Sequence, residues 1–180
     1  MMLGPAGSWA AAYPDASVTH MTWRWSNVPL PERFLGALGA GALLHLVVPL
    51  RLPLPGPSRL AGGALVATGA GLVAWSVASA ADTTVDSPQA LVTKGAYAVT
   101  RNPMYLGWGV AVLGAVLLSR NAWLAIAWLH AARSVHHEVL EEERSLAARF
   151  GASFEHYRAS RPRYLPQLRA LILRPWPRTA

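Results

Sequence analysis

The sequence predicts an all-α integral membrane protein, a helical bundle with about four transmembrane helices. Of its 180 residues 53% are hydrophobic and only 14% are charged, against about 25% charged residues in an average soluble domain. The hydrophobic residues are also clustered, and the first two clusters, Phe34–Leu50 and Leu60–Ala81, contain no charged residue. Each is long enough to cross a bilayer, which takes ~17–20 residues. A soluble protein with buried helices is disfavoured, because too few charged residues remain to cover such a core.

Proline and glycine residues interrupt the predicted helices in the first half of the chain. Residues 1–33 contain four prolines, so we expect an irregular, interfacial N-terminal segment before a single membrane domain over residues 34–180. The segment Arg51–Arg59 has three prolines and a glycine, which predicts a turn between the first two spans. Glycines in the second span let helix backbones approach closely. Packing is therefore favoured over the alternative that Gly69 and Gly71 leave room for a cofactor.

Two shorter apolar segments, Met104–Leu118 and Ala122–Ala132, are separated by only three residues. This spacing predicts a tight helical hairpin as spans 3 and 4. The second arm is expected to continue into water as the charged helix Arg133–Phe150, which Gly151 ends. With a further short helix over Ser153–Ser160, it would form a cytosolic C-terminal helical tail.

The net charge is +7, and its distribution predicts the orientation of the chain. With four spans and the N-terminus inside, thirteen basic residues fall on the inner side and three on the outer side. This asymmetry agrees with the positive-inside rule and places both termini in the cytoplasm. The arginine-rich tail then faces anionic lipid headgroups. Nucleic acid is a partner of many basic chains, but this placement of charge favours membrane lipids.

A polar cluster at the start of the third apolar segment is the first candidate site. Asparagine is favoured at the N-cap of a helix and proline at its first position, so Asn102 and Pro103 can simply begin the helix. Capping does not explain the neighbouring Tyr97, Arg101 and Tyr105. From the residues alone, capping and ligand binding are equally supported.

The second candidate is the acidic segment His136–Gly151, in which four glutamates fall within six positions. The spacing favours a solvated helix face over a site for a cationic ligand. The nearby His130, His136 and His137 form no recognised ligand pattern, so no metal site is expected. Hydrolase motifs and phosphate-binding glycine loops are also missing from the sequence.

Taken together, the two candidates resemble the isoprenylcysteine carboxyl methyltransferase family, whose relatives include the phospholipid methyltransferases and bacterial integral membrane methyltransferases. The stretch Leu91–Gly107, "LVTKGAYAVTRNPMYLG", is similar to the family's Leu-Val-Thr-x-Gly-x-Tyr and Arg-His-Pro-x-Tyr pattern. Asn102 stands where the family has histidine. The stretch Glu142–Pro166 is similar to the family's Glu-Glu-x-x-Leu, Phe-Gly and terminal Arg-x-x-Pro pattern. The likeness covers roughly residues 60–166.

The resemblance implies a methyltransferase that uses S-adenosylmethionine, resides in a bacterial inner membrane and holds its cofactor in a region of about residues 89–166. The methyl acceptor would be a lipophilic or small molecule with a carboxylate, thiol or amine, reached at the cytosolic face. The implied cofactor-binding residues are Gln89, Leu91, Val92, Tyr97, Arg101, Asn102, Pro103, Met104, Tyr105, Glu142 and Glu143. Which glutamate of positions 141–143 contacts the cofactor stays open. For an amine acceptor, Glu142 or His137 would take the proton.

These residue types suit such a cofactor. Carboxylates attract its sulfonium and ammonium groups, tyrosine faces attract cations, and Arg101 can pair with its carboxylate. Two other functions remain: an NADPH-dependent membrane reductase of the sterol reductase type, and a non-catalytic membrane protein on the same scaffold.

Overall fold

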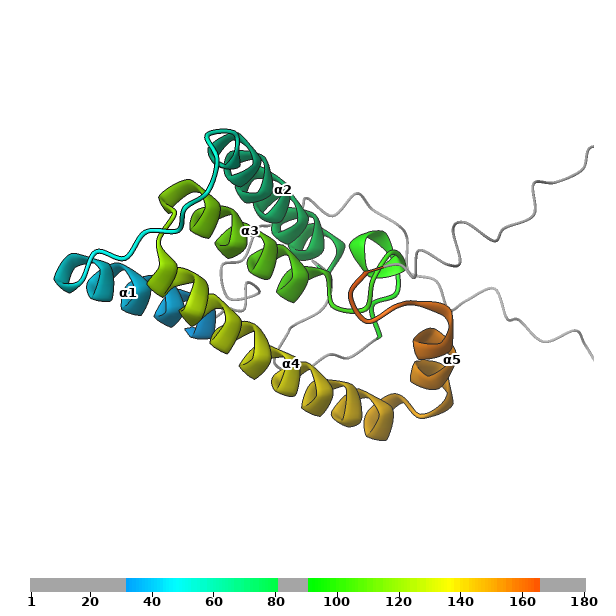
Figure 1. The fold of residues 1–180 in the computed structure, drawn as a ribbon. Coiled ribbons are helices and arrows are strands. Elements are labelled where there is room, and N and C mark those ends of the chain that lie inside the picture. Colours follow the sequence, from blue (N-terminus) through cyan, green and yellow to red (C-terminus); the bar gives the residue numbers. More distant parts are fainter. Residues whose placement is uncertain (1–31, 81–90, 166–180) are drawn as a thin grey trace, which may run out of the picture.

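The computed structural model describes residues 32–80 and 91–165 (Figure 1). The helices in chain order are α1 (Glu32–Val47), α2 (Ser58–Ser79), the 3-10 turn η2 (Gly95–Ala98), α3 (Pro103–Ser119), α4 (Ala122–Phe150) and α5 (Ala152–Ser160). The described residues form helices, turns and one isolated bridge, so the predicted all-α class is confirmed. The N-terminal segment falls almost wholly outside the described residues, as does Gln89.

The helices pack as two pairs. α2 packs along α3, and α1 packs along the first half of α4 (Figure 1). The ion pair between Arg33 and Glu138 ties the start of α1 to α4. The turn between α3 and α4 is as tight as predicted, because Arg120 has a left-handed φ of 52° and Asn121 caps α4. The arms of this hairpin nevertheless pack mainly on other helices rather than on each other.

The lengths of the helices bear on the predicted number of membrane spans. Among the described residues, only α2, with 22 residues, is both long and apolar enough to cross a membrane. α1 has 16 residues and α3 has 17, which at 1.5 Å per residue gives about 24 and 26 Å, short of the ~30 Å hydrocarbon core. α1 ends at Val47 rather than at Leu50 because Pro49 disfavours a helical residue before it. The four-span bundle is therefore not confirmed.

The contact between α2 and α3 depends on glycine. A Cβ atom at Gly69 would lie 2.5 Å from the carbonyl oxygen of Gly107, and one at Gly114 would lie 2.6 Å from that of Gly62. Gly71, by contrast, has no neighbour within 4 Å of such an atom. The packing interpretation of the α2 glycines is thus confirmed at Gly69, where α3 fills the space that a cofactor would need.

We expect Gly69→Val to lower the stability of the folded protein in detergent by about 1–3 kcal/mol, as overpacking does. The added side chain cannot enter the α2–α3 contact without separating the two backbones. Thermal unfolding measures the effect, and Gly71→Val is the matched control, because it adds the same β-branched side chain where space is open. Equal melting temperatures for the two variants would show that this contact is not tight in the protein.

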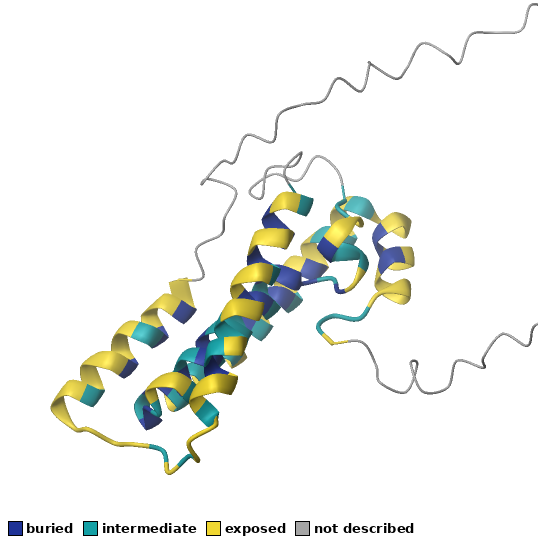
Figure 2. Ribbon diagram, turned by 90° about the horizontal axis from the view of Figure 1, so that it is seen from above, coloured by how far each residue is buried: buried dark blue, intermediate teal, exposed yellow. Residues whose placement is uncertain are grey.

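The outer surface of the bundle is apolar. Figure 2 shows α1 exposed along most of its length, and its exposed residues include Leu43, Leu46 and Val47. Leu46 is 81% exposed. Large apolar residues exposed along one helix in this way are typical of a face covered by lipid or by another protein.

The two inter-helix turns lie together at one end of the bundle. The backbone N–H of Leu52 donates to the carbonyl of Arg120, and that of Ala122 donates to the carbonyl of Leu50. The side chain of Asn121 also donates to the carbonyl of Gly41 at 2.9 Å. The segment before α3, the second half of α4 and the residues after α5 gather at the opposite end, where the candidate site lies (Figure 1).

Candidate functional site

Asn102 occupies the N-cap of α3 and Pro103 the first helical position, as predicted, but the Asn102 side chain does not cap the helix. Its Nδ2 instead donates to Oε1 of Glu143 and to the carbonyl oxygen of Arg163, both at 3.3 Å. Asn102 is buried. The amide therefore joins three segments that are far apart in the sequence: the loop before α3, α4, and the residues after α5.

Glu143 is the centre of this junction. The guanidinium of Arg163 donates to both carboxylate oxygens, at 3.1 and 2.9 Å, and Arg101 lies 3.5 Å from Oε2. Burial acts to raise the pKa of Glu143, but the hydrogen bond from Arg163 and the charge of Arg101 outweigh it, and the pKa is lowered. Glu143 is thus an ionised, buried carboxylate that two arginines already neutralise.

Further hydrogen bonds hold the loop and the C-terminal residues in place. The hydroxyl of Thr100 donates to the carbonyl of Arg163 at 2.9 Å, and the hydroxyl of Tyr157 on α5 donates to the carbonyl of Tyr97 at 2.7 Å. Gly95 has a φ of +59°, a conformation that favours glycine, and it packs against Ser79 at the end of α2. Contacts with α2, with α5 and with the residues after α5 therefore hold the loop before α3 in place.

Glu142 differs from Glu143 in its surroundings. The residue is exposed, yet desolvation of its carboxyl group by the side chains around it raises its pKa, the charge of Glu143 adds to this shift, and a hydrogen bond with Tyr105 partly offsets it. Burial and the charge of Glu142 raise the pKa of Tyr97 to about 12. Among the described residues, none of the groups that shift the pKa of Glu142 is a cation. This carboxylate therefore faces two tyrosines with no countercharge supplied by these neighbours.

The other two glutamates of the acidic segment have ordinary surroundings. Glu138 pairs with Arg33, and Glu141 is exposed. By exposure, the solvated-face interpretation is therefore correct for Glu141 and Glu142 and wrong for the buried Glu143.

Arg101 is buried, with 9% of its side chain exposed. Burial lowers its pKa, which the charge of Glu143 partly restores. Although its Nη1 atom is the one nearest Glu143, Nη1 and Nε have no hydrogen-bond partner among residues 32–80 and 91–165. Buried donors are nearly always satisfied in native proteins, and a guanidinium pairs well with carboxylates. Arg101 is therefore suited to an anionic group of a ligand.

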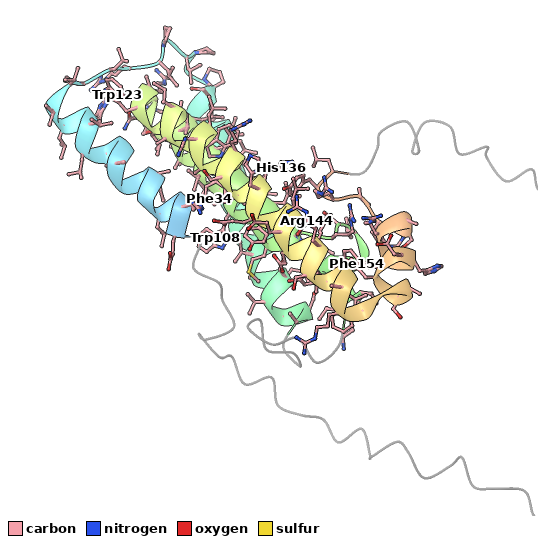
Figure 3. The ribbon with its side chains drawn as sticks, turned by 90° about the horizontal axis from the view of Figure 1, so that it is seen from below. Phe34, Trp108, Trp123, His136, Arg144 and Phe154 are labelled. Carbon is pink, nitrogen blue, oxygen red and sulfur yellow. The ribbon has the colours of Figure 1, made fainter. Side chains whose placement is uncertain are left out.

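An apolar cavity of about 220 Å³ adjoins these residues, between α1, α3, α4 and the residues after α5. Phe34, Val135 and Trp128 line it, together with Tyr105, which also faces Glu142. Figure 3 shows Trp123, His136 and Arg144 in this order along α4, and His136 lies in the cavity wall. Tyr105 thus lines the cavity and also contacts Glu142 of the polar residues.

The predicted site residues are partly brought together. We define the polar cluster as Tyr97, Arg101, Asn102, Tyr105, Glu142, Glu143 and Arg163. Pro103 and Met104 are buried in the first turn of α3 beside it, and Leu91 and Val92 are half-buried ahead of η2. Gln89 is outside the described residues. His137 is exposed on α4 and does not line the cavity.

Three residues of the site were missed by sequence reasoning: His136, Arg163 and Tyr164. Arg163 begins the terminal Arg-x-x-Pro pattern, so the motif contained it without indicating a role. His136 is seven residues before Glu143, which puts the two on the same helix face. This spacing in the sequence could have indicated that His136, rather than His137, faces inward.

Among residues 32–80 and 91–165, no group of three or more metal-ligating side chains is arranged to hold a metal ion. No curated protein and no solved structure matches the chain. The family model of the phospholipid methyltransferases does match it, over residues 57–153. The match covers more than half of the chain and includes α2, the loop before α3 and both central glutamates. This match shows that the chain belongs to the phospholipid methyltransferase family, a membrane-associated family of methyltransferases.

Proposed function

We propose that the protein is an S-adenosylmethionine-dependent methyltransferase of the isoprenylcysteine carboxyl methyltransferase type, embedded in a bacterial inner membrane. It transfers a methyl group to a lipophilic or small acceptor at the cytosolic face. The observation that carries the proposal is that the polar cluster contains both a carboxylate and a guanidinium with unused capacity for a charged ligand. In the described part of the chain, no cation is among the groups that shift the pKa of Glu142, and Nε and Nη1 of Arg101 have no hydrogen-bond partner.

The polar cluster fits the charges of this cofactor. When bound, the cofactor supplies a methyl group activated by a positively charged sulfur. Glu142, with the faces of Tyr97 and Tyr105, would hold the cationic groups, since a tyrosine face attracts a cation by about 0.5–2 kcal/mol. Arg101 would hold the carboxylate. Glu143 is saturated by Arg101, Arg163 and Asn102, so its role is to position Arg101 and the loop.

The chain contributes mainly alignment and the exclusion of water. Correct alignment of two reacting groups is worth about 7–11 kcal/mol. The apolar cavity beside Tyr105 would receive the apolar part of the acceptor. Glu142 is a candidate base that could take the proton of an amine acceptor. His137, the other candidate base of the sequence prediction, is exposed on α4 and would need to reach the acceptor from outside the cavity.

The distribution of basic residues supports the orientation in this proposal. The polar cluster lies at the end of the bundle opposite the two inter-helix turns, and Arg101, Arg133, Arg144 and Arg163 all belong to this end in a four-span topology. An excess of arginine on one side favours the cytoplasm for that side. The N- and C-termini and the polar cluster would then lie on the cytoplasmic side.

Calorimetric titration of the full-length protein in detergent tests the proposal. We expect S-adenosylmethionine and its demethylated product to bind and NADPH not to bind. Binding of NADPH alone would favour a membrane reductase. If none of the three binds at near-millimolar concentration, the proposed function fails and the non-catalytic alternative is favoured.

A further inference from the structure

We infer that His136 accepts a proton from the methyl acceptor, and that the acceptor is an apolar molecule whose nucleophilic atom, an amine nitrogen or a thiol sulfur, carries a dissociable proton. This inference rests on the proposed methyltransferase function and names the acceptor class of the same site. It concerns a histidine and a cavity to which the sequence prediction gives no role.

The composition of the cavity wall indicates an apolar occupant. Apart from Tyr105, His136 and Tyr164, the lining side chains are apolar, and the indole N–H of Trp128 already donates to the carbonyl of Gly109 at 2.9 Å. The volume of about 220 Å³ is below the ~300–1,000 Å³ of pockets for drug-sized ligands. The cavity therefore suits a group about the size of one ring, with any longer chain outside it.

The His136 imidazole is held in a defined orientation. Its Nδ1 lies 3.0 Å from the hydroxyl oxygen of Tyr164. Burial raises the pKa of Tyr164 despite the opposing charge of Arg163, so the hydroxyl stays neutral and can either donate to Nδ1 or accept from Nδ1–H, depending on the tautomer of the ring. The proposed step requires the tautomer in which Nδ1–H donates to the hydroxyl. In that tautomer Nε2 is unprotonated and is the proton acceptor of the ring.

The histidine lies near the polar cluster without belonging to it. His136 and Glu143 share one face of α4, about 10 Å apart along the helix axis. Tyr164 directly follows Arg163, which binds Glu143, and Tyr105 contributes to both the cavity and the cluster. An acceptor in the cavity would therefore have His136 at one side and the polar cluster at the other.

A carboxylate acceptor fits this cavity poorly. It is already ionised and needs no base, so the histidine in the cavity wall would have no role in its methylation. The cations of the site, Arg101 and Arg163, do not line the cavity. Glu142 is a less suitable base, because a proton on it would remove the charge that favours a cationic cofactor.

A thiol acceptor is deprotonated as it is methylated. The acceptor loses the proton of its S–H bond to Nε2 of His136. The electron pair left on the acceptor sulfur forms a bond to the methyl carbon. At the same time the bond between the methyl carbon and the cofactor sulfur breaks, and its electron pair stays on the cofactor sulfur. The products are a methyl thioether, the neutral demethylated cofactor and a protonated His136, which returns the proton to water. An alkylammonium acceptor loses one N–H proton in the same way.

His136→Asn is the test variant, because the asparagine amide occupies the place of Cγ and Nδ1 and lacks a base at the Nε2 position. The probes are phenylmethanethiol, which is mostly protonated at neutral pH, and thiophenol, which is mostly ionised. We expect the cofactor-loaded variant to methylate phenylmethanethiol at least 100-fold more slowly than the wild type, as loss of a general base does. Its rate with thiophenol should change little. His137→Asn, an exposed neighbour, is the control.

A second readout needs no cofactor. In histidine-labelled protein, phenylmethanethiol should shift the nitrogen resonances of His136, assigned by their loss in His136→Asn, and leave those of His137 unchanged. Three results would each overturn the inference. The first is unchanged His136 resonances, and the second is an equal loss of rate with both thiols. The third is that wild-type protein binds S-adenosylmethionine but methylates neither thiol. Failure of S-adenosylmethionine to bind the wild type in calorimetry would instead overturn the proposed function.

Discussion

Glu142→Gln is expected to weaken S-adenosylmethionine binding about 10- to 100-fold while the protein stays folded. An interaction with a charged group is worth about 1.5–3 kcal/mol, and each ~1.4 kcal/mol is a factor of ten in affinity. The substitution keeps the shape of the side chain and removes the charge that faces Tyr97 and Tyr105. Calorimetry in detergent measures the change, with Glu141→Gln as the matched control on the exposed face.

The same residue predicts a pH dependence. Its surroundings raise the pKa of Glu142, so part of the population is protonated at a pH where an ordinary glutamate is ionised. A bound cation favours the ionised form, lowers this pKa and displaces the proton. Affinity in the wild type should therefore rise as the pH increases through the raised pKa, with proton release that calorimetry in buffers of different ionisation enthalpy detects. The same pH dependence in Glu142→Gln would show that another group is responsible.

Glu143→Ala is expected to lower the free energy of unfolding by about 3 kcal/mol. Removing one partner of a buried ion pair typically costs about 3–5 kcal/mol, and we take the lower figure because Arg163 is 34% exposed. The loss leaves buried Arg101 without its countercharge and releases the residues after α5 from the loop before α3. Thermal unfolding and protease cleavage after Arg163 measure the two consequences, with Glu141→Ala as the control.

The stabilising effect of Glu143 is also expected to depend on pH, but here the pKa is lowered rather than raised. Because the pKa of Glu143 is lowered in the folded protein, its stabilising effect is complete above the pKa of an unfolded glutamate and is lost as the pH falls through the lowered value. The difference in stability between wild type and Glu143→Ala should therefore shrink in acid. A difference that stays constant with pH would mean that packing, not charge, is what the substitution removes.

The order of the helices could be predicted because local residues determine it. Pro49 and the prolines of 51–59 end α1 and begin the turn, and Gly151, with a φ of +50°, ends α4 where expected. The lengths of the spans were less predictable, since an apolar segment continues past the point at which proline ends the helix. A hydrophobic segment thus predicts a span more readily than it predicts the length of the helix.

The site was only partly predictable, because its main contacts join residues far apart in the chain. Asn102 has the sequence position of a cap, and only the fold shows that its amide bonds Glu143, 41 residues away. Adjacent residues on a helix point in directions about 100° apart, so Glu142 and Glu143, like His136 and His137, have different surroundings. The motif identifies such pairs, but the packing of α4 decides which member faces inward.

Photo-crosslinking of labelled S-adenosylmethionine to the full-length protein, followed by mapping of tryptic peptides, tests the central claim most directly. That claim is that the loop before α3 and the acidic part of α4 together form the binding site for the methyl donor. We predict label in the peptides spanning residues 95–101 or 102–120 and in the peptide spanning residues 134–144, with less label in Glu142→Gln. Absence of label from both regions, in protein that binds the cofactor, would contradict the account.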